Sequence, residues 1–432
     1  MRLQATFNYN AIMKKPFSWD YDSDQPYQLK DRSFKKAMRR KEGLSLLMTV
    51  ISTLFVLPLV FLMQLIIPKR QINATHFFGM SINLDKDPEI TKKLVDELEL
   101  NTLLIRFPLW EIERIEAYVT FVKSYSDKHI LINIMQDREH VEDLHLLTKD
   151  LNTVFKEMGP YVTSFQVGTT INRAKWGFFS VHEYLRFYQA AYHLKQQCFS
   201  HLKLIGPSVI DFEYHFTTHA LFNFFRLKYD ALSALLYVDR RGAPENSQLG
   251  FNLFRKITLL DALAFFSPKT KRAIYLTETN WPISNTAPYA PTSEYECVSE
   301  SLYTEYMLRY YLLAFASQKV DTVYWHQLIA PGYGLIDSRN NLKKREAFDA
   351  FKVMLQQLNN TEFVSFSSQN NTFILVVKNS TKTTSVLWSL QPKKQALSKE
   401  VLCYNYLGEE TETSTIQIST KPIYITKSIH DL

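Results

Sequence analysis

The sequence predicts an α/β protein whose main domain is a (β/α)8 barrel, preceded by a transmembrane helix and followed by a small all-β sandwich. Three observations lead to this prediction. Short apolar runs alternate with amphipathic stretches throughout residues 76–358. An uncharged run covers residues 44–67, and beyond residue 360 the chain changes to short segments between polar turns. Each pattern is typical of the element assigned to it.

The barrel is predicted from eight successive strand-plus-helix units. The expected strands are residues 76–82, 101–107, 129–135, 161–167, 202–206, 231–237, 272–277 and 322–327. The expected helices are residues 89–100, 111–125, 141–158, 181–199, 216–228, 248–266, 293–317 and 343–358. The strands are almost continuously apolar, as expected when helices cover a parallel sheet. An open doubly wound sheet is the alternative, but the 11 glycines form no dinucleotide-binding fingerprint.

The run 44–67 is long enough to cross a bilayer. As a helix it spans roughly 36 Å, against a hydrocarbon core of about 30 Å. Pro58 lies within it, and transmembrane helices tolerate proline. A cleaved signal peptide is a weaker interpretation, because the run is long, starts late and has no small-x-small cleavage site. A buried core helix is the other alternative.

The charges that flank this run predict its orientation. Five basic residues precede it, whereas Lys69 and Arg70 follow it; the five are Lys35, Lys36, Arg39, Arg40 and Lys41. The positive-inside rule then places the N-terminus in the cytoplasm and the main domain in the periplasm or another extracytoplasmic space. The predicted divisions are a weakly ordered basic tail at 1–43, the transmembrane helix at 44–67, the barrel at 71–358 and the β-domain at 361–432.

Composition excludes several functional classes. The net charge is +7, but residues 1–41 alone hold ten Lys/Arg and four Asp. The basicity therefore belongs to the tail, and we expect no nucleic-acid partner. Three distant cysteines form no CxxC, which argues against a zinc site or a disulfide framework, although one pair could bridge in an oxidising compartment. With no HxH or HExxH pattern either, we expect no metal and no cofactor.

Working residues of such a barrel lie where strands end and the following loops begin. At these positions the chain has Arg106 after the second strand, Tyr237 after the sixth, Glu278 (in LTETNWP) after the seventh and Trp325 at the eighth. The layout resembles the retaining glycoside hydrolases of the large (β/α)8 clan that includes cellulase-like and xylosidase-like enzymes. The resemblance covers residues 76–358, and a trailing β-domain is a common companion of that barrel.

The resemblance implies a role for each of these residues. Glu278 matches the nucleophile, Arg106 and Tyr237 match residues that orient it, and Trp325 matches the aromatic platform of the sugar site. For Arg106, Tyr237 and Trp325 a purely structural role is the alternative. A carboxylate directly after an apolar strand is harder to explain structurally, so Glu278 carries the functional prediction.

The fourth strand departs from the family pattern. Where the clan has Asn-Glu, with the Glu as general acid/base, the segment VGTTIN places Thr169 and Thr170. A threonine hydroxyl does not protonate a leaving oxygen near neutral pH, and loss of a general acid costs about 10²–10⁴ in rate. The retaining mechanism also needs two carboxyl groups about 5–5.5 Å apart.

Three explanations remain open for this departure. Another acid could replace the missing one; the loops offer Asp137, Asp211, Glu213 and Asp239, and we take Glu213 as the candidate. The reaction could need no acid, because the leaving group is already stable as an anion or because an acceptor sugar is used. Alternatively, the site could bind glycan without cleaving it.

Two loops are expected to contact substrate. Asn172, Lys175 and Trp176 make the fourth-strand loop polar, cationic and aromatic, which suits an acidic or phosphate-bearing glycan; a solvated loop is the alternative. After the sixth strand, Arg240 is a candidate for recognising a carboxylate or phosphate. An internal salt bridge with Glu245 is the competing interpretation.

The sequence thus predicts a membrane-anchored glycosidase acting on an envelope or exported polysaccharide, in association with envelope-polysaccharide machinery. The rival is a catalytically inactive glycan-binding or polysaccharide-assembly protein on the same barrel. A lyase or isomerase is a third possibility, because a fold does not fix a function.

Overall fold

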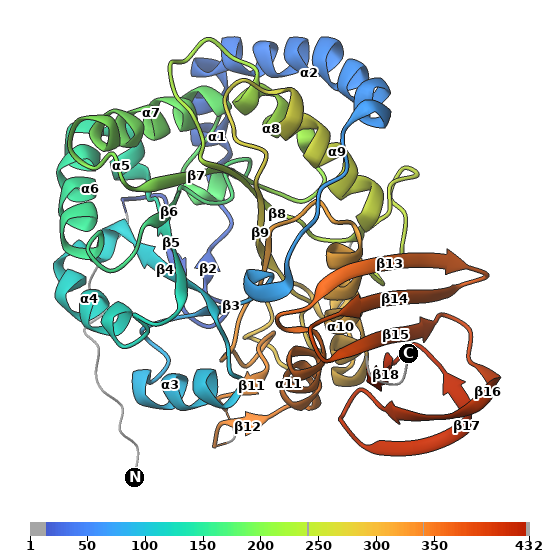
Figure 1. Cartoon of the computed structure of the whole chain (residues 1–432). Helices are drawn as coiled ribbons and strands as arrows, with labels where there is room; N and C mark the ends of the chain where they lie inside the picture. The colour runs from blue at the N-terminus through green and yellow to red at the C-terminus, as the bar shows by residue number, and fades with distance from the viewer. Residues whose placement is uncertain (1–13, 240–241, 340, 429–432) are drawn as a thin grey trace.

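The barrel that the sequence predicts is present. The computed structural model describes residues 14–239, 242–339 and 341–428. Eight parallel strands close into a ring in which β10 pairs with both β9 and β3 (Figure 1). The strands are β3 (Phe78–Ile82), β4 (Thr102–Pro108), β5 (His129–Met135), β6 (Ser164–Val167), β7 (Lys203–Ile210), β8 (Ala231–Leu235), β9 (Ile274–Thr279) and β10 (Thr322–Trp325).

A ring of helices covers the strands, as Figure 1 shows. They are α3 (Pro88–Glu97), α4 (Ile115–Lys123), α5 (Arg138–Glu142), α6 (Leu144–Met158), α7 (Val181–Cys198), α8 (Tyr214–Leu221), α9 (Leu253–Phe266), α10 (Glu300–Ala316) and α11 (Glu346–Leu358). Apolar side chains of different strands, Leu104, Leu131 and Tyr324 among them, form a cluster separate from the one between strands and helices.

Several elements differ from their predicted bounds, β7 and α8 among them. Strand β7 runs on to Ile210, so part of the expected fifth loop is strand. Helix α8 ends at Leu221, well before the expected residue 228. The Asn223 amide donates to the carbonyl oxygens of His219 and Ala220 at 3.0 and 2.8 Å. A side chain that satisfies the last carbonyls of a helix favours its termination there.

The C-terminal domain is an antiparallel β-sandwich, as predicted. Its six strands hydrogen-bond in the order β13-β14-β15-β18-β16-β17. They are β13 (Glu362–Gln369), β14 (Thr372–Lys378), β15 (Lys382–Ser389), β16 (Lys393–Tyr404), β17 (Glu410–Ile418) and β18 (Ile423–Ser428). One set of side chains, including Leu375 and Trp388, joins the main core, whereas Cys403 and Ile416 belong to a second, smaller core.

The N-terminal segment reaches the barrel. Two short strands, β1 (Trp19–Asp20) and β2 (Gln25–Pro26), pair as a hairpin, and Asp24 beside β2 forms an ion pair with Arg106 of β4. Lys14 pairs with Glu142 of α5. The sequence analysis expected a weakly ordered tail across a membrane from the barrel. In the structure the tail contacts the barrel directly, and a bilayer between them would break these contacts.

The apolar run forms α2 (Gly43–Met63), which follows α1 (Arg32–Lys41) and continues into the 3-10 turn Gln64–Ile66. Among the described residues, one helix is long and apolar enough to cross a membrane, and it is this one. It lies outside the ring of helices, along α8 and α9 (Figure 1). Only 11% of its most apolar window is buried, which argues against the alternative of a buried core helix.

A buried guanidinium joins the two domains. Arg309 of α10 is 2% exposed and pairs with Glu245 at 2.8 Å and with Glu305 at 3.4 Å. It also donates to the carbonyl oxygen of Thr420, at 3.0 Å. Glu245 in turn accepts a hydrogen bond from the Trp388 indole of β15.

We expect Arg309→Met to lower the free energy of unfolding by about 3–5 kcal/mol, because it leaves the buried carboxylates without their partner. Thermal and denaturant unfolding of the purified chain measure this loss. The control is Lys92→Met, which removes an exposed i,i+4 pair with Asp96 worth about 0.3–0.5 kcal/mol. Equal losses for the two variants would contradict the structural role of Arg309.

Candidate functional site

A cavity of about 290 Å³ lies at the C-terminal ends of the barrel strands. This is close to the lower end of the ~300–1,000 Å³ typical of ligand pockets. Its wall includes six residues that matter for chemistry: Arg106, Thr170, Lys175, Tyr237, Glu278 and His326. Five of them are residues that the sequence indicates, and the sixth, His326, follows the indicated Trp325. The tail supplies a further part of the wall.

Glu278 is the next-to-last residue of β9 and is half-buried. The Tyr237 hydroxyl, two residues beyond β8, donates to its Oε1 at 2.8 Å. Strands β8 and β9 are neighbours in the ring, so their carboxyl ends bring these two side chains together. The structure thus places the predicted nucleophile and one predicted orienting residue in contact.

Arg106 projects from β4 into the same cavity and is 5% exposed. Its Nη1 donates to Asp24 Oδ2 at 2.7 Å and its Nε to the Met135 sulfur at 3.0 Å. Burial alone would lower the pKa of Arg106, but the Asp24 carboxylate and, less strongly, Glu278 raise it above its ordinary value. Arg106 therefore remains a cation facing Glu278, while its hydrogen bond goes to the tail.

The prediction that Trp325 forms the sugar platform is wrong. Trp325 is fully buried, stacks on Trp281 with ring centroids 5.7 Å apart, and donates its indole N–H to Tyr303 of α10 at 2.7 Å. Strand residues alternate between the two faces of a sheet. Tyr324 and His326 therefore face the barrel axis, and His326 lines the cavity. Burial lowers the pKa of His326 to about 4, so the ring is neutral at physiological pH.

The backbone of the fourth-strand loop is held by the side chain of Gln136, which follows β5. Gln136 donates to the carbonyl oxygens of Thr169 and Trp176, at 2.9 and 2.7 Å, and accepts from the Thr169 N–H at 2.9 Å. Thr170 adopts a left-handed φ of 51° and lines the cavity with Glu278. Thr170, which the sequence aligns with the acid of the family it resembles, thus contributes a hydroxyl side chain to the cavity wall.

Glu213 and Asn172 are occupied elsewhere. Glu213 accepts from Arg173 at 2.8 Å and from Asn172 at 2.7 Å. Asn172 also bonds both the N–H and the carbonyl of Ile210, at 3.0 Å each. Glu213 lines a neighbouring cavity with Asp211, and among described residues the carboxylates on the Glu278 cavity are Glu278 and Asp24. The structure therefore does not bring Glu213 to the wall around Glu278.

Lys175 and Trp176 do line the cavity. Lys175 donates to Gln25 of the tail at 2.5 Å. Burial lowers the pKa of Lys175 to about 8, against the opposing effect of Glu278. The Trp176 ring meets Trp19 edge-on at a centroid distance of 5.7 Å. Both predicted substrate residues thus face the site, but the tail touches each of them.

The tail hairpin is the part of the site that the sequence analysis missed. Asp24 Oδ2 accepts hydrogen bonds from Arg106, from Asn83 at 3.1 Å and from Gln327 at 3.2 Å. The Trp19 ring lies 5.2 Å from that of Trp110. The alternation of aromatic and acidic residues at positions 19–24 was the available signal. It was overlooked because the apolar run that follows predicted a membrane between tail and barrel.

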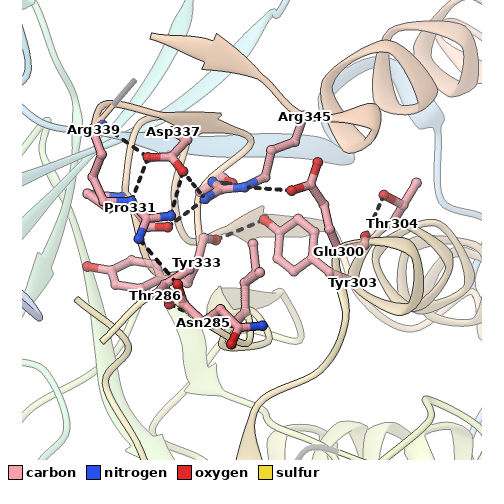
Figure 2. Close-up of polar contacts among 12 residues, drawn as sticks. Asn285, Thr286, Glu300, Tyr303, Thr304, Pro331, Tyr333, Asp337, Arg339 and Arg345 are labelled. Carbon is pink, nitrogen blue, oxygen red and sulfur yellow. Dashed lines mark hydrogen bonds and ion pairs between the residues drawn. The ribbon is translucent and has the colours of Figure 1, made fainter. Parts of the chain in front are cut away.

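His326 and Tyr333, from the loop after β10, line the cavity. Figure 2 shows the polar contacts of Arg345, Asp337 and Tyr303 that hold this loop. The buried Arg345 donates to the carbonyl oxygens of Gly334 and Pro331, at 2.7 and 2.6 Å, and pairs with Asp337 at 3.0 Å. Tyr303 donates to the Tyr333 carbonyl at 2.8 Å. The chain around Tyr333 is therefore fixed from two sides.

Arg240 lies outside the described residues, so its predicted substrate contact stays a prediction. Glu245, the partner in the competing interpretation, forms an ion pair with Arg309. That contact belongs to the junction of the two domains.

Neither a protein-family model nor a curated protein sequence matches the chain. Solved structures do match. A family 39 glycoside hydrolase from Bacteroides cellulosilyticus WH2 has a TM-score of 0.62 and 13% identity, covering 82% of this chain and 81% of that one. A family 30 endoxylanase from Clostridium papyrosolvens C71 has a TM-score of 0.58 and 11% identity, covering 83% and 98%.

A family 39 β-xylosidase from Caulobacter crescentus is similar in the same way, with a TM-score of 0.56 and 10% identity over 83% of this chain and 97% of that one. Sequence identities this low support a shared fold only. The chemistry has to be argued from the residues of the site. The resemblance expected from the sequence is confirmed at that level: the chain has the fold of the (β/α)8 glycoside hydrolases of families 39 and 30.

Proposed function

We propose that this protein is a retaining glycoside hydrolase in which Glu278 is the nucleophile. The observation that supports this best is the contact of Tyr237 with Glu278 at the wall of a cavity in the barrel mouth. A carboxylate held there by one donor keeps a second oxygen for attack on an anomeric carbon. Arg106 supplies a nearby positive charge that faces this carboxylate.

We assign the missing acid role to Lys175 rather than to Glu213. Lys175 shares the cavity with Glu278, whereas Glu213 is engaged by Arg173 and Asn172. In the first step Glu278 attacks the anomeric carbon, the glycosidic bond breaks, and the Lys175 ammonium gives its proton to the leaving oxygen. In the second step the neutral amine takes a proton from the water that releases the sugar from Glu278. Trp176 and His326 are the surfaces available to the sugar ring.

A non-catalytic glycan-binding or assembly protein is the second candidate function. The ion pair of Asp24 with Arg106 favours this function, because Arg106, a cation of the site, is already paired with a carboxylate from the tail. Thr170 favours it too, since it faces the cavity without an ionisable group.

We further propose that the protein acts at a membrane, on an envelope or exported polysaccharide, with envelope-polysaccharide machinery as its setting. Helix α2 supports membrane attachment through its length and its mean hydropathy of 2.5. The predicted orientation has the tail in the cytoplasm and the barrel outside. It would require Lys14 and Asp24 to leave Glu142 and Arg106. Attachment without crossing keeps both pairs.

Replacement of Glu278 by Gln is expected to abolish glycoside cleavage, because an amide is too weak a nucleophile to form the glycosyl-enzyme. The measurement is a screen of the full-length protein in detergent on dinitrophenyl glycosides and polysaccharides, beside Glu278→Gln. Glu362→Gln, an exposed carboxylate of β13, is the control and should behave as the unmodified protein. Cleavage that survives in Glu278→Gln would remove its catalytic role; glycan binding without any cleavage would support the second function.

The proton donor predicts a pH dependence. A lysine donates only while protonated, so kcat/KM on a glycoside with an alkyl leaving group should fall as the pH rises through about 8. Lys175→Met should lower that rate by about 10²–10⁴ and abolish the basic limb. It should affect a dinitrophenyl glycoside much less, because that leaving group needs no proton.

The matched control is Lys93→Met, an exposed lysine of α3, which should leave both substrates unaffected. If Glu213→Gln rather than Lys175→Met slowed only the alkyl glycoside, the acid would be Glu213 and our assignment would be wrong.

A further inference from the structure

Helix α2 leaves one apolar face uncovered. On this outer face Leu54, Phe55 and Leu62 are exposed by 66, 75 and 70%. On the inner face Ser45 and Thr49 are buried against the barrel helices near the start of α2, and Val60 is buried near its end. Soluble proteins rarely leave a contiguous apolar surface of this kind uncovered.

The inner face is fixed to the barrel by specific polar contacts. Thr49 Oγ1 lies 2.7 Å from Nδ1 of His219 at the end of α8. Ser45 Oγ accepts from the N–H of His182 in α7 at 3.1 Å. Burial lowers the pKa of His219 to about 4, so the ring that contacts Thr49 is neutral at physiological pH. If α2 crossed the membrane surrounded by lipid, it would have to leave α7 and α8, and its Ser45 and Thr49 hydroxyls would be exposed to hydrocarbon.

The chain on both sides of α2 returns to the barrel. Before it, Ser180 at the start of α7 donates to Glu42 at 2.6 Å, and Asp24 is paired with Arg106. After it, Arg70 pairs with Asp321 at 2.5 Å. A helix of this length that crossed a bilayer would separate its ends by about the bilayer thickness and place them on opposite sides. The contacts place both ends on one side.

A basic helix lies next to the apolar face. Helix α1 carries five cations that line a shallow hollow, namely Arg32, Lys35, Lys36, Arg39 and Arg40, and it meets α2 at Glu42. Its first turn contains no acidic residue. An apolar face beside a cationic one is the combination by which in-plane helices bind anionic lipid.

We infer that α2 lies in the plane of a membrane that contains anionic phospholipid, with its outer face in the apolar layer and α1 at the headgroups. Tail and barrel then share one side, and the hairpin stays in the barrel mouth. The inference rests on the membrane attachment in the proposed function and is independent of sugar cleavage.

Vesicle flotation of the full-length protein tests the surface. After detergent removal it should float with phosphatidylcholine vesicles, and more completely at low salt when phosphatidylglycerol is included, because salt screens the headgroup attraction. Leu54→Glu combined with Phe55→Glu should abolish flotation with both vesicle types. Lys36→Glu combined with Arg40→Glu should remove only the preference for phosphatidylglycerol.

The control is Tyr161→Glu, an exposed aromatic residue of the barrel that should leave flotation unchanged. Failure to float with either vesicle would overturn the inference. One such outcome is a soluble dimer in which a second copy of the chain covers the apolar face. Flotation does not require the protein to cleave a glycoside. The protein can therefore fail to float and still cleave glycosides, or float and cleave none.

Cysteine labelling in native membranes separates an in-plane from a spanning helix. Single cysteines are placed at Tyr27 of the tail and Tyr295 of the barrel, 52 and 101% exposed, in a chain whose three native cysteines are alanine. A membrane-impermeant maleimide should label both positions from the same side, and the cysteine-free chain from neither. Labelling from opposite sides of the membrane would show that α2 crosses it.

Discussion

The ion pair between Arg106 and Asp24 joins the segments on either side of helix α2. Arg106 belongs to a barrel strand and is almost wholly buried, so its charge needs a partner inside the mouth. Breaking such a pair by removing one member costs about 3–5 kcal/mol. While the pair holds, residues 14–31 stay at the mouth, α1 and α2 lie against the barrel, and the cavity has its present wall. The shape of the site and the placement of the apolar helix thus both depend in part on this ion pair.

The barrel itself supplies the chemistry. Parallel strands end at the same edge, so Tyr237, Glu278 and Arg106, which are distant in sequence, meet around one cavity. Lys175 enters from the loop after β6 and faces the same space. Three basic side chains, Arg106, Arg173 and Lys175, therefore share a cavity with Glu278 and Asp24, and the tail carboxylate offsets part of their charge. A glycan that displaced the hairpin would need a group able to replace Asp24 at Arg106, which favours an acidic sugar.

Much of the fold could be predicted from the sequence, because each barrel strand is an apolar run bounded by amphipathic helices. The same periodicity located Glu278, Tyr237 and Arg106 at strand ends. The periodicity gave a wrong result at Trp325, because it does not show which of two adjacent residues faces the barrel axis. The neighbouring His326 faces the axis, and Trp325 does not. The periodicity failed at Glu213 because Arg173 and Asn172, which engage it, lie some forty residues earlier in the chain. The tail prediction differs from the structure for another reason. Hydropathy indicates the length of α2 but not the contacts by which Ser45 and Thr49 attach it to the barrel.

Zero-length crosslinking tests most directly whether the tail lies on the barrel in the native membrane. Lys14 and Glu142 are 2.6 Å apart and partly exposed, so a carbodiimide should join them in an amide bond that mass spectrometry identifies. Lys344 and Glu97, also 2.6 Å apart but both within the barrel domain, provide the internal reference. The account predicts both crosslinks in intact membranes. A Lys344–Glu97 crosslink without one between Lys14 and Glu142 would place the tail away from the barrel and contradict it.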